Sequence, residues 1–350
     1  MRKYLAVTVL ASAVLASASP ALAATEPLQR QVDRLTEHSA VPGALLSVRE
    51  PDGTVRTWTS GTAQRGTGRP MVGSDARFRV ASNTKPVIAA AVLKLVDEGR
   101  IDLDQPVEKY APGLLDGRPI TVRQILTHTS GLPEYGNLID PKGPLDDRTF
   151  LRAALDADPV GPGWSYANTN YLVAGMLIEK VTGKGFRAYT RQTVLRPLGD
   201  TYWPRKDETG IRGKHAHTYG VDPFNPESQG RKVVDTTRQP AYLFGASGGL
   251  VSTPDDLNRF WQSLSLSTIK AMTADTVPAA DPPGGRQGLG LVRYQLACGP
   301  AYLHGGGLPG IRSLSGRDRA GRAVTLYVTG VPADEKALFQ VFEAAMCAGR

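Results

Sequence analysis

Segments with strand-like patterns lie near both ends of this chain, while helical patterns dominate its middle. Residues 44–49 and 54–58 flank a Pro-Asp-Gly turn, and three further strand-like runs near the other end cover residues 289–296, 311–315 and 323–328. Strands joined by short turns form antiparallel pairs. The two ends of the chain are therefore predicted to meet in one antiparallel sheet, and the middle is predicted to be an insertion into it.

Helical apolar spacing begins at residues 28–38 and recurs at the far end over residues 333–347. We expect an α/β (α+β) fold: an antiparallel sheet flanked by N- and C-terminal helices, with an inserted mostly helical domain. The predicted boundaries are 24–85 and 241–350 for the α/β sheet domain and 86–240 for the helical domain. The composition, 41% hydrophobic and 21% charged, is that of a globular chain and excludes collagen, coiled coil and wholesale disorder.

Residues 1–23 have the pattern of a secretory signal peptide. Arg2 and Lys3 supply positive charge, an apolar stretch runs from residue 5 to about residue 18, and Ala-Leu-Ala at residues 21–23 resembles a cleavage site. A membrane anchor is the alternative, but the apolar run is too short to span a bilayer, and no cysteine follows the cleavage pattern to carry a lipid. We therefore expect a secreted protein, extracellular or cell-wall associated, without a membrane anchor.

The chain has two cysteines, Cys298 and Cys347. In an exported protein a disulfide between them is the favoured interpretation, and two reduced, buried thiols are the alternative. His215 and His217 resemble half of a metal site, but no third ligand has useful spacing. Because no phosphate loop or nucleotide fingerprint is present either, we predict neither a metal nor another cofactor.

The net charge of +8 does not indicate a nucleic-acid partner. A nucleic-acid-binding surface requires clustered basic residues with aromatic residues among them, and here the basic residues are scattered along the chain. We read most of these charges as solvated surface and predict no nucleic-acid binding.

Ser82-Asn83-Thr84-Lys85 follows a short strand-like run and begins an apolar helix predicted over residues 84–98. A serine at a helix N-terminus lies beside free backbone N–H groups, and a lysine three residues later lies on the same helix face. If it is buried, that lysine can activate the serine hydroxyl. A capping serine with a solvated lysine is the alternative. The same spacing recurs from Ser267 to Lys270, but this copy follows no strand and precedes no suitable tyrosine, so we discount it.

Tyr166-Ala167-Asn168 lies in a Pro/Gly-rich turn just before a helix predicted over residues 170–182. A phenol beside an ammonium group has a lowered pKa and can carry a proton between reacting groups. An asparagine amide can hold a substrate carbonyl. An interfacial tyrosine with an asparagine helix cap is the alternative, and residues 135–137 show the same Tyr-x-Asn spacing.

His304-Gly305-Gly306-Gly307 follows a predicted strand over residues 301–303. Glycines at such a position let a substrate backbone approach closely and pair along the strand edge. A glycine-rich turn with an incidental histidine is the alternative. We predict that Ser82, Lys85, Tyr166 and His304 face one crevice.

With these three motifs in this order, the chain resembles the serine β-lactamase/DD-peptidase superfamily (penicillin-binding-protein-like). The closest likeness is to secreted actinobacterial D-alanyl-D-alanine carboxypeptidases. The similarity covers nearly all of the chain after the leader, and it includes both cysteines and residues 77–80, 96–99, 120–124, 130–132 and 174–180.

The resemblance implies a role for each motif residue. Ser82 would be the nucleophile that forms an acyl-enzyme, with Lys85 and Tyr166 as its acid/base partners. Asn168 would bind the substrate amide. His304 would take the place of the third-motif cation, and the backbone N–H groups of Ser82 and Gly307 would form the oxyanion hole.

The third motif departs from the carboxypeptidase pattern. That pattern has hydroxyl residues, which help to hold the terminal carboxylate of the substrate, where this chain has Gly305 and Gly307. Where that pattern has an assisting arginine, this chain has a valine, and Arg293 is the next residue. Where the pattern has an aromatic residue in the wall of the site, this chain has Tyr242. A site that lacks two hydroxyls and an arginine should bind a free carboxylate less well. We nevertheless predict that Gly305, Gly306, Gly307, Tyr242 and Arg293 line the substrate site.

The sequence therefore predicts a secreted, monomeric serine hydrolase that acts on the D-Ala-D-Ala end of peptidoglycan stem peptides and that β-lactams inhibit covalently. An esterase or D-amino-acid amidase with the same residues is one alternative. A penicillin-binding sensor that is acylated without turning over is the alternative from another functional class. The absence of a late Lys-Ser/Thr-Gly and of Ser-Asp-Asn argues against a class A β-lactamase.

Overall fold

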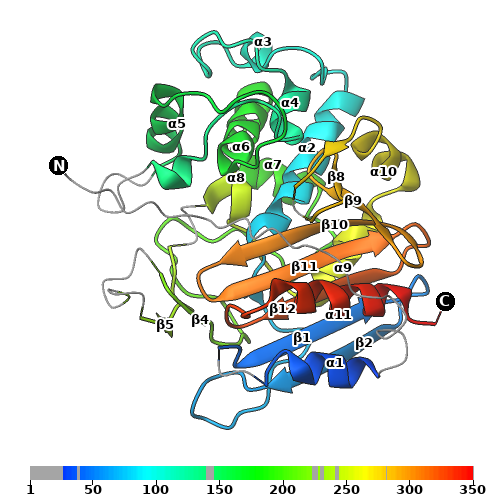
Figure 1. Ribbon diagram of the computed structural model, residues 1–350. Coiled ribbons are helices and arrows are strands. Elements are labelled where there is room, and N and C mark those ends of the chain that lie inside the picture. Colours follow the sequence, from blue (N-terminus) through cyan, green and yellow to red (C-terminus); the bar gives the residue numbers. More distant parts are fainter. Residues whose placement is uncertain are drawn as a thin grey trace.

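The computed structural model describes residues 27–37, 40–138, 146–222, 228, 232–240, 244–280 and 282–349. The predicted signal peptide and Tyr242 lie outside the described residues. An antiparallel sheet occupies one half of the molecule and a group of helices occupies the other half, as Figure 1 shows. The predicted fold class is thereby confirmed.

The main sheet has eight strands in the order β2-β1-β12-β11-β10-β9-β8-β7, and every neighbouring pair is antiparallel. The first strands of the chain pair directly with the last one, because β1 runs between β2 and β12. The bounds are β1 Gly43–Arg49, β2 Val55–Gly61, β7 Val277–Pro278, β8 Arg286–Gln287, β9 Val292–Leu296, β10 Gly299–Leu308, β11 Ile311–Asp318 and β12 Ala323–Val328. Both chain ends therefore build one sheet, as the hairpin patterns predicted.

Several of these strands differ from the prediction. Strand β10 was expected only over residues 301–303 but continues through the three glycines to Leu308. Pairing with β11 holds this glycine-rich stretch extended, although glycine has little intrinsic preference for strands. The two-residue strands β7 and β8 were not predicted, since so short a run has no periodicity to detect.

Helices cover both faces of the sheet. Helices α1 (Leu28–Arg34) and α11 (Glu335–Cys347) lie on the face in front in Figure 1 and share a hydrophobic core with β1 and β12. The predicted disulfide is present: Cys298 in the β9–β10 turn is bonded to Cys347 at the end of α11. It closes a loop of 49 residues, which in the chain-entropy model stabilises the fold by about 4 kcal/mol.

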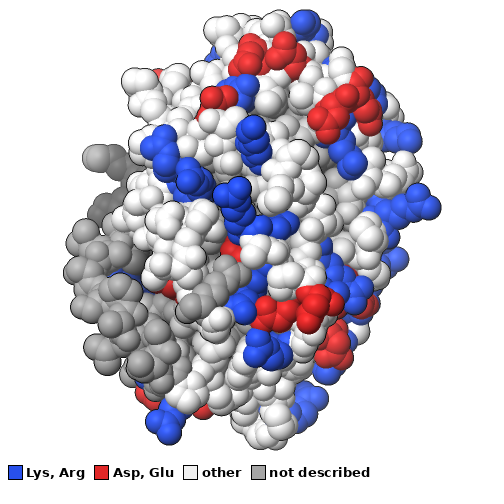
Figure 2. Space-filling model, turned by 90° about the vertical axis from the view of Figure 1, so that its right-hand side faces the viewer, with Lys and Arg blue, Asp and Glu red and all other residues white. Residues whose placement is uncertain are grey.

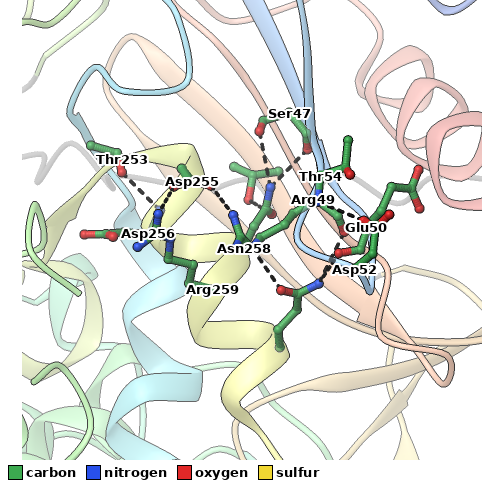
Figure 3. A network of polar contacts seen from close by, with 12 residues as sticks. Ser47, Arg49, Glu50, Asp52, Thr54, Thr253, Asp255, Asp256, Asn258 and Arg259 are labelled. Carbon is green, nitrogen blue, oxygen red and sulfur yellow. Dashed lines mark hydrogen bonds and ion pairs between the residues drawn. The ribbon is translucent and has the colours of Figure 1, made fainter. Parts of the chain in front are cut away.

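Helix α9 (Pro254–Ser263) packs on the opposite face of the sheet, and Figure 3 shows the polar contacts that attach it to β1. Arg49 Nη1 forms an ion pair with Asp255 Oδ1 at 3.0 Å. Asn258 Nδ2 donates to the backbone oxygen of Ser47 at 3.2 Å. Asn258 is fully buried, so this bond satisfies a polar group that would otherwise be costly to bury.

The helical half is built around two long helices, α2 (Thr84–Asp97) and α6 (Asn168–Thr182). Both were predicted to within two residues. Shorter helices pack around them: α3 Val107–Tyr110, α4 Val122–Leu126, α5 Asp147–Asp156, α7 Phe186–Thr193, α8 Gly245–Gly248 and, beside β8, α10 Leu266–Met272. Two small pairs, β3 Phe78–Arg79 with β6 Val251–Ser252 and β4 Tyr219–Gly220 with β5 Val234–Asp235, flank the main sheet. Over the described residues, no helix is both long and apolar enough to cross a membrane.

On the face shown in Figure 2, Lys and Arg side chains are spread widely, and Asp and Glu side chains lie beside several of them. Ion pairs join several basic and acidic side chains of the molecule. Arg123, for example, pairs with Asp104 at 2.6 Å and with Asp275 at 3.0 Å. The distribution on this face agrees with the scattered charge pattern of the sequence.

Candidate active site

The segment that carries Ser82 makes a tight turn between the sheet region and the long helix α2. A single turn of 3-10 helix, Ala81–Asn83, joins β3 to α2, so Ser82 precedes the α-helix by two residues instead of beginning it. Ala81 has a φ of +51°, which an L-residue with a side chain adopts only at a cost of about 1 to 2 kcal/mol. This strained turn presents Ser82 beside the N-terminus of α2.

Lys85 lies on the first turn of α2 and its side chain is completely buried. Its Nζ lies 2.9 Å from Ser82 Oγ, 2.8 Å from Asn168 Oδ1 and 2.8 Å from the backbone oxygen of Ser247. Burial lowers the pKa of Lys85 to about 7, although the nearby charge of Glu134 acts in the opposite direction. A substantial fraction of this amine is therefore uncharged at neutral pH.

The three partners of Lys85 fit the uncharged amine well. An uncharged amine has two N–H donors and one lone pair, and two of the partners, Asn168 Oδ1 and Ser247 O, can only accept. The third partner, Ser82 Oγ, can donate its proton to the lone pair. Deprotonated Lys85 is therefore oriented to remove the proton from Ser82.

Tyr166 and His304 also lie near the amine of Lys85. Lys85 Nζ lies 4.9 Å from the centre of the Tyr166 ring, and the rings of Tyr166 and His304 are 6.3 Å apart. The structure thus brings together Ser82, Lys85, Tyr166 and His304, together with Asn168. The predicted convergence of these residues on one site is found, while their catalytic roles stay predictions.

His304 differs from the cation expected at its position. Burial and the charge of Lys85 lower the pKa of His304 to about 3, so the imidazole is neutral near pH 7. Its Nδ1 lies 2.5 Å from the backbone oxygen of Gly305, which can only accept, so the ring proton is on Nδ1. His304 can polarise the site as a neutral dipole, but it does not supply a positive charge.

The three glycines of β10 serve different purposes. A Cβ on Gly306 would lie only 2.5 Å from the backbone oxygen of Val80 and 2.7 Å from Asn83 Nδ2. Strand β10 therefore lies too close to the segment that carries Ser82 for any side chain at position 306. Gly305, by contrast, has room for a side chain. Among the described residues β9 pairs with β10 only as far as Leu303, which leaves the edge from His304 to Leu308 unpaired next to Ser82.

Gly307 lies against an arginine that sequence analysis did not identify. Arg312, its partner on β11, has Nη1 3.3 Å from the position a Gly307 Cβ would take. The guanidinium also bonds Glu335 at 2.8 Å and two backbone oxygens, and its Nη2 has no hydrogen-bond partner in the described part of the chain. Arg293, the predicted arginine, lies exposed on β9 opposite Tyr302, and within the described ranges no hydrogen bond or ion pair joins it to the other site residues.

Sequence analysis missed three further residues of this site. Asn83 Nδ2 donates a hydrogen bond to Ser313 Oγ at 3.0 Å and thereby attaches the segment that carries Ser82 to β11. Glu134 Oε2 accepts the backbone N–H of Asn168 at 2.5 Å and so caps α6. Ser247 contributes only a backbone oxygen, for which no residue-type signal exists. Asn83 lies inside the Ser-x-x-Lys motif, but nothing in the sequence indicated its contact or those of the other two residues, because each acts through a partner far away in sequence.

The second copies of two motifs have environments that differ from those of the first copies. Ser267 and Lys270 are exposed on α10, where Ser265 caps the helix. Tyr135 is buried against Phe150, and burial raises its pKa far above the usual value. His217 bonds Asp235 at 2.7 Å, and no cluster of three or more metal-ligating side chains exists among the residues described.

Comparison with known proteins agrees with this geometry. The family model described as Beta-lactamase matches residues 28–344, which include every residue of the site. This chain belongs to the Beta-lactamase family. The match supports the resemblance inferred from the three motifs.

Two curated relatives of this chain bear names that indicate different functions. The chain is 26% identical over 267 residues to the putative penicillin-binding protein PbpX of Bacillus subtilis, covering 74% of this chain and 63% of PbpX. It is 34% identical over 190 residues to the esterase EstB of Burkholderia gladioli, covering 48% of each chain. The chain thus spans about half to two thirds of the length of these relatives.

Solved structures match over nearly their full length. A D-stereospecific amidohydrolase from Streptomyces sp. superimposes with a TM-score of 0.77 at 30% identity, covering 90% of this chain and 97% of the other. The D-amino acid amidase of Ochrobactrum anthropi SV3, complexed with L-phenylalanine amide, gives a TM-score of 0.77 at 25% identity, covering 93% and 98%. The solved structures similar to this chain thus include proteins named as an amidohydrolase and an amidase.

Proposed function

We propose that this protein is a serine hydrolase that works through an acyl-enzyme on Ser82. The main support is the buried amine of Lys85, which is hydrogen-bonded to Ser82 Oγ, Asn168 Oδ1 and Ser247 O. A fully buried lysine with a pKa of about 7 can act as a general base at physiological pH. An exposed lysine would be charged and unable to accept the serine proton.

The proposed reaction has two halves. In acylation the Ser82 proton passes to Lys85, Ser82 Oγ bonds the substrate carbonyl carbon, and the bond to the leaving amine or alcohol breaks as that group receives a proton through Tyr166. In deacylation a water molecule attacks the acyl carbon and gives a proton to the same groups. The bond between the acyl carbon and Ser82 Oγ then breaks, Oγ takes that proton back, and the carboxylic acid product is released. The unpaired edge of β10 lies beside Ser82, where its backbone can hold the acyl part of the substrate.

The substrate proposed first is the D-Ala-D-Ala end of peptidoglycan stem peptides, so the protein would be a carboxypeptidase. Arg312 supports this choice, because its guanidinium lies beside Gly307 and its Nη2, which has no partner among the described residues, can donate to a terminal carboxylate. The names of a penicillin-binding relative and a D-stereospecific structural neighbour are consistent with it. Substrates of this kind lie outside the cytoplasm, which agrees with the proposed signal peptide and with secretion.

A second candidate is an amidase for D-amino-acid amides or a small-ester hydrolase. Gly305 and Gly307 favour it, since they lack the hydroxyl groups that would help Arg312 to hold a carboxylate. Such substrates have no terminal carboxylate, and the esterase relative and the amidase neighbour bear names of this kind. A penicillin-binding sensor is a third possibility of a different class, in which acylation occurs without turnover.

One set of measurements separates these candidates. Turnover of diacetyl-Lys-D-Ala-D-Ala, of its C-terminal amide and of short-chain nitrophenyl esters is compared, and mass spectrometry locates the adduct after exposure to penicillin. Cleavage of the acid faster than its amide supports the carboxypeptidase, and the reverse supports the amidase. A Ser82 adduct without any turnover indicates the sensor. A protein that neither turns over any substrate nor acquires an adduct on Ser82 contradicts the proposal.

The role of Arg312 is tested within the same set. Replacing Arg312 by Met should reduce turnover of the acid about tenfold while changing that of its amide less than twofold. Arg293→Met serves as the matched control, because Arg293 is the exposed arginine that the structure does not connect to the site. Equal loss on acid and amide would remove Arg312 from carboxylate recognition.

A further inference from the structure

His128 is a buried histidine directly behind Tyr166, outside the three sequence motifs. It follows α4 and its side chain is fully buried. Its φ of +57° lies in the left-handed region, a conformation that is uncommon for a residue with a side chain. Such backbone strain persists only where the surrounding contacts enforce it, and it is concentrated at functional sites.

The contacts of His128 converge on the segment that carries Tyr166. The two rings stack with their centres 4.3 Å apart at an interplanar angle of 26°. The backbone oxygen of His128 accepts the N–H of Ser165 at 2.8 Å. Its Nδ1 accepts the N–H of Ala167 at 3.3 Å and lies 3.2 Å from Asn170 Nδ2. One residue thus holds the ring of Tyr166 and the backbone on both sides of it.

The protonation state of His128 follows from these contacts. Burial and the nearby charge of Lys85 lower its pKa well below the usual value, so the ring is neutral. Because Nδ1 accepts hydrogen bonds, the single ring proton must be on Nε2, and Nε2 has no partner in the described structure. A buried donor without a partner is costly, and an apolar ring of similar size would avoid that cost. The acceptor at Nδ1 therefore distinguishes histidine from a hydrophobic filler here.

We propose that His128 is a positioning residue for acyl transfer, which fixes the Tyr166 phenol relative to Lys85 by stacking on its ring and accepting from its neighbouring backbone. This inference rests on the proposed function, since it assigns Tyr166 a part in proton transfer. His128 does not touch the reacting atoms. Lys85 Nζ lies over the Tyr166 ring at 4.9 Å, so a small displacement of this ring changes the geometry of proton transfer directly.

Two substitutions separate the two contacts of His128. His128→Phe keeps an aromatic ring against Tyr166 but removes the Nδ1 acceptor. His128→Asn keeps an acceptor oxygen near Nδ1 and suits a left-handed backbone, but it removes the ring. Phe342→Leu serves as the stability control, because Phe342 is fully buried in α11 within the separate core on the other side of the sheet.

Two rates are measured: the phosphonylation of Ser82 by a fluorophosphonate probe and its acylation by a nitrophenyl ester. For each reagent the maximal rate and the half-saturation concentration are determined separately. Thermal unfolding of each variant is measured alongside. We expect about a 100-fold lower maximal rate for His128→Phe and about a 10-fold lower rate for His128→Asn, with half-saturation within threefold of wild type. Phe342→Leu should be labelled within twofold of the wild-type rate.

Each other outcome has a definite meaning. Rates within twofold of wild type in both His128 variants overturn the inference, as does a loss in Phe342→Leu equal to that in His128→Phe. If His128→Phe does not fold, the rate of His128→Asn decides by the same limits. A wild-type protein that neither reagent modifies at Ser82 overturns the proposed function, and this inference with it. A reactive wild type with unaffected His128 variants overturns the inference alone.

Discussion

The same four-residue pattern, Ser-x-x-Lys, occurs twice in this chain and has two different environments. At residues 82–85 the lysine is fully buried and its amine has three hydrogen-bond partners from separate parts of the chain. At residues 267–270 both side chains are exposed on a short helix at the molecular surface. Both copies have the same spacing, but only in the first copy is the lysine buried away from water.

The difference shows where the reactivity of such a pair originates. Helical spacing alone puts the lysine on the same face as the serine. Removing water from the amine lowers its pKa, and that requires the bulk of α6, α8 and β10 around it. The comparison therefore predicts that equal substitutions in the two copies have very unequal effects.

The largest effect is expected from Ser82→Ala. It removes the nucleophile and should reduce turnover of any ester or peptide substrate by about 10⁴-fold or more. Ser267→Ala is the matched control and should leave turnover unchanged. Retained turnover in Ser82→Ala, measured on purified protein by a continuous ester assay, would show that the acyl-enzyme is formed elsewhere.

Lys85→Met comes next. Loss of the base should lower the acylation rate by about 10³-fold, because general-base catalysis typically contributes factors of 10² to 10⁴. Lys270→Met should change it less than twofold. Stopped-flow measurement of the acylation burst tests both variants. A Lys85 variant with near wild-type acylation would assign the base to another group.

The pH dependence of acylation is the third test. Lys85 must lose its proton to accept that of Ser82, so the acylation rate should fall about tenfold per unit below a pH of about 7 and level off above it. An ester without titratable groups, assayed between pH 5 and 9, gives this profile directly. A rate independent of pH across this range would contradict a titrating Lys85.

Asn168→Asp should shift that profile. A carboxylate 2.8 Å from the amine would favour the charged lysine and raise its pKa by about 1 to 3 units, so the acidic limb should move to higher pH. Asn137→Asp is the control, because Asn137 is the exposed asparagine of the second Tyr-x-Asn copy. A limb that moves equally in both variants, or in neither, would argue against direct contact between Asn168 and the base.

The smallest effect concerns stability. The pKa of Lys85 falls from 10.5 to about 7 on folding, so the unfolded chain binds one more proton between these values, and wild-type stability should rise with pH through this window. Lys85→Met lacks this term. Its free energy of unfolding at pH 7 should exceed that of wild type by about 1 to 3 kcal/mol, and the excess should shrink towards pH 10. Lys270→Met should show no such change in denaturant titrations.

Several parts of the fold could be predicted because the information is local. The hairpin around Pro51 and the helices 84–97 and 168–182 follow from apolar periodicity and from turn residues. The disulfide was the favoured interpretation because the chain has only two cysteines and an export pattern at its start, although two reduced thiols remained the alternative. The extent of β10 could not be predicted, because its glycines are held extended by β11 and not by their own preference.

The residues of the site likewise divide into those that the sequence predicted and those that it did not. The sequence by itself predicted which side chains carry the chemistry: the serine, lysine, tyrosine, asparagine and histidine of three motifs, in an order that indicated their family. Their catalytic roles stay predictions. The sequence did not reveal Arg312, Glu134 or His128 as parts of the site, since each reaches it through partners 5 to 39 residues away along the chain.

Only the tertiary structure decided the charge states within the site. Lys85 loses part of its charge, and His304 is neutral at the position where the superfamily pattern has a cation, because both are enclosed by elements from distant parts of the chain. Desolvation depends on the atoms packed around a group and not on its neighbours in sequence. For this reason two identical Ser-x-x-Lys patterns differ, one as a candidate catalytic pair and the other as ordinary surface.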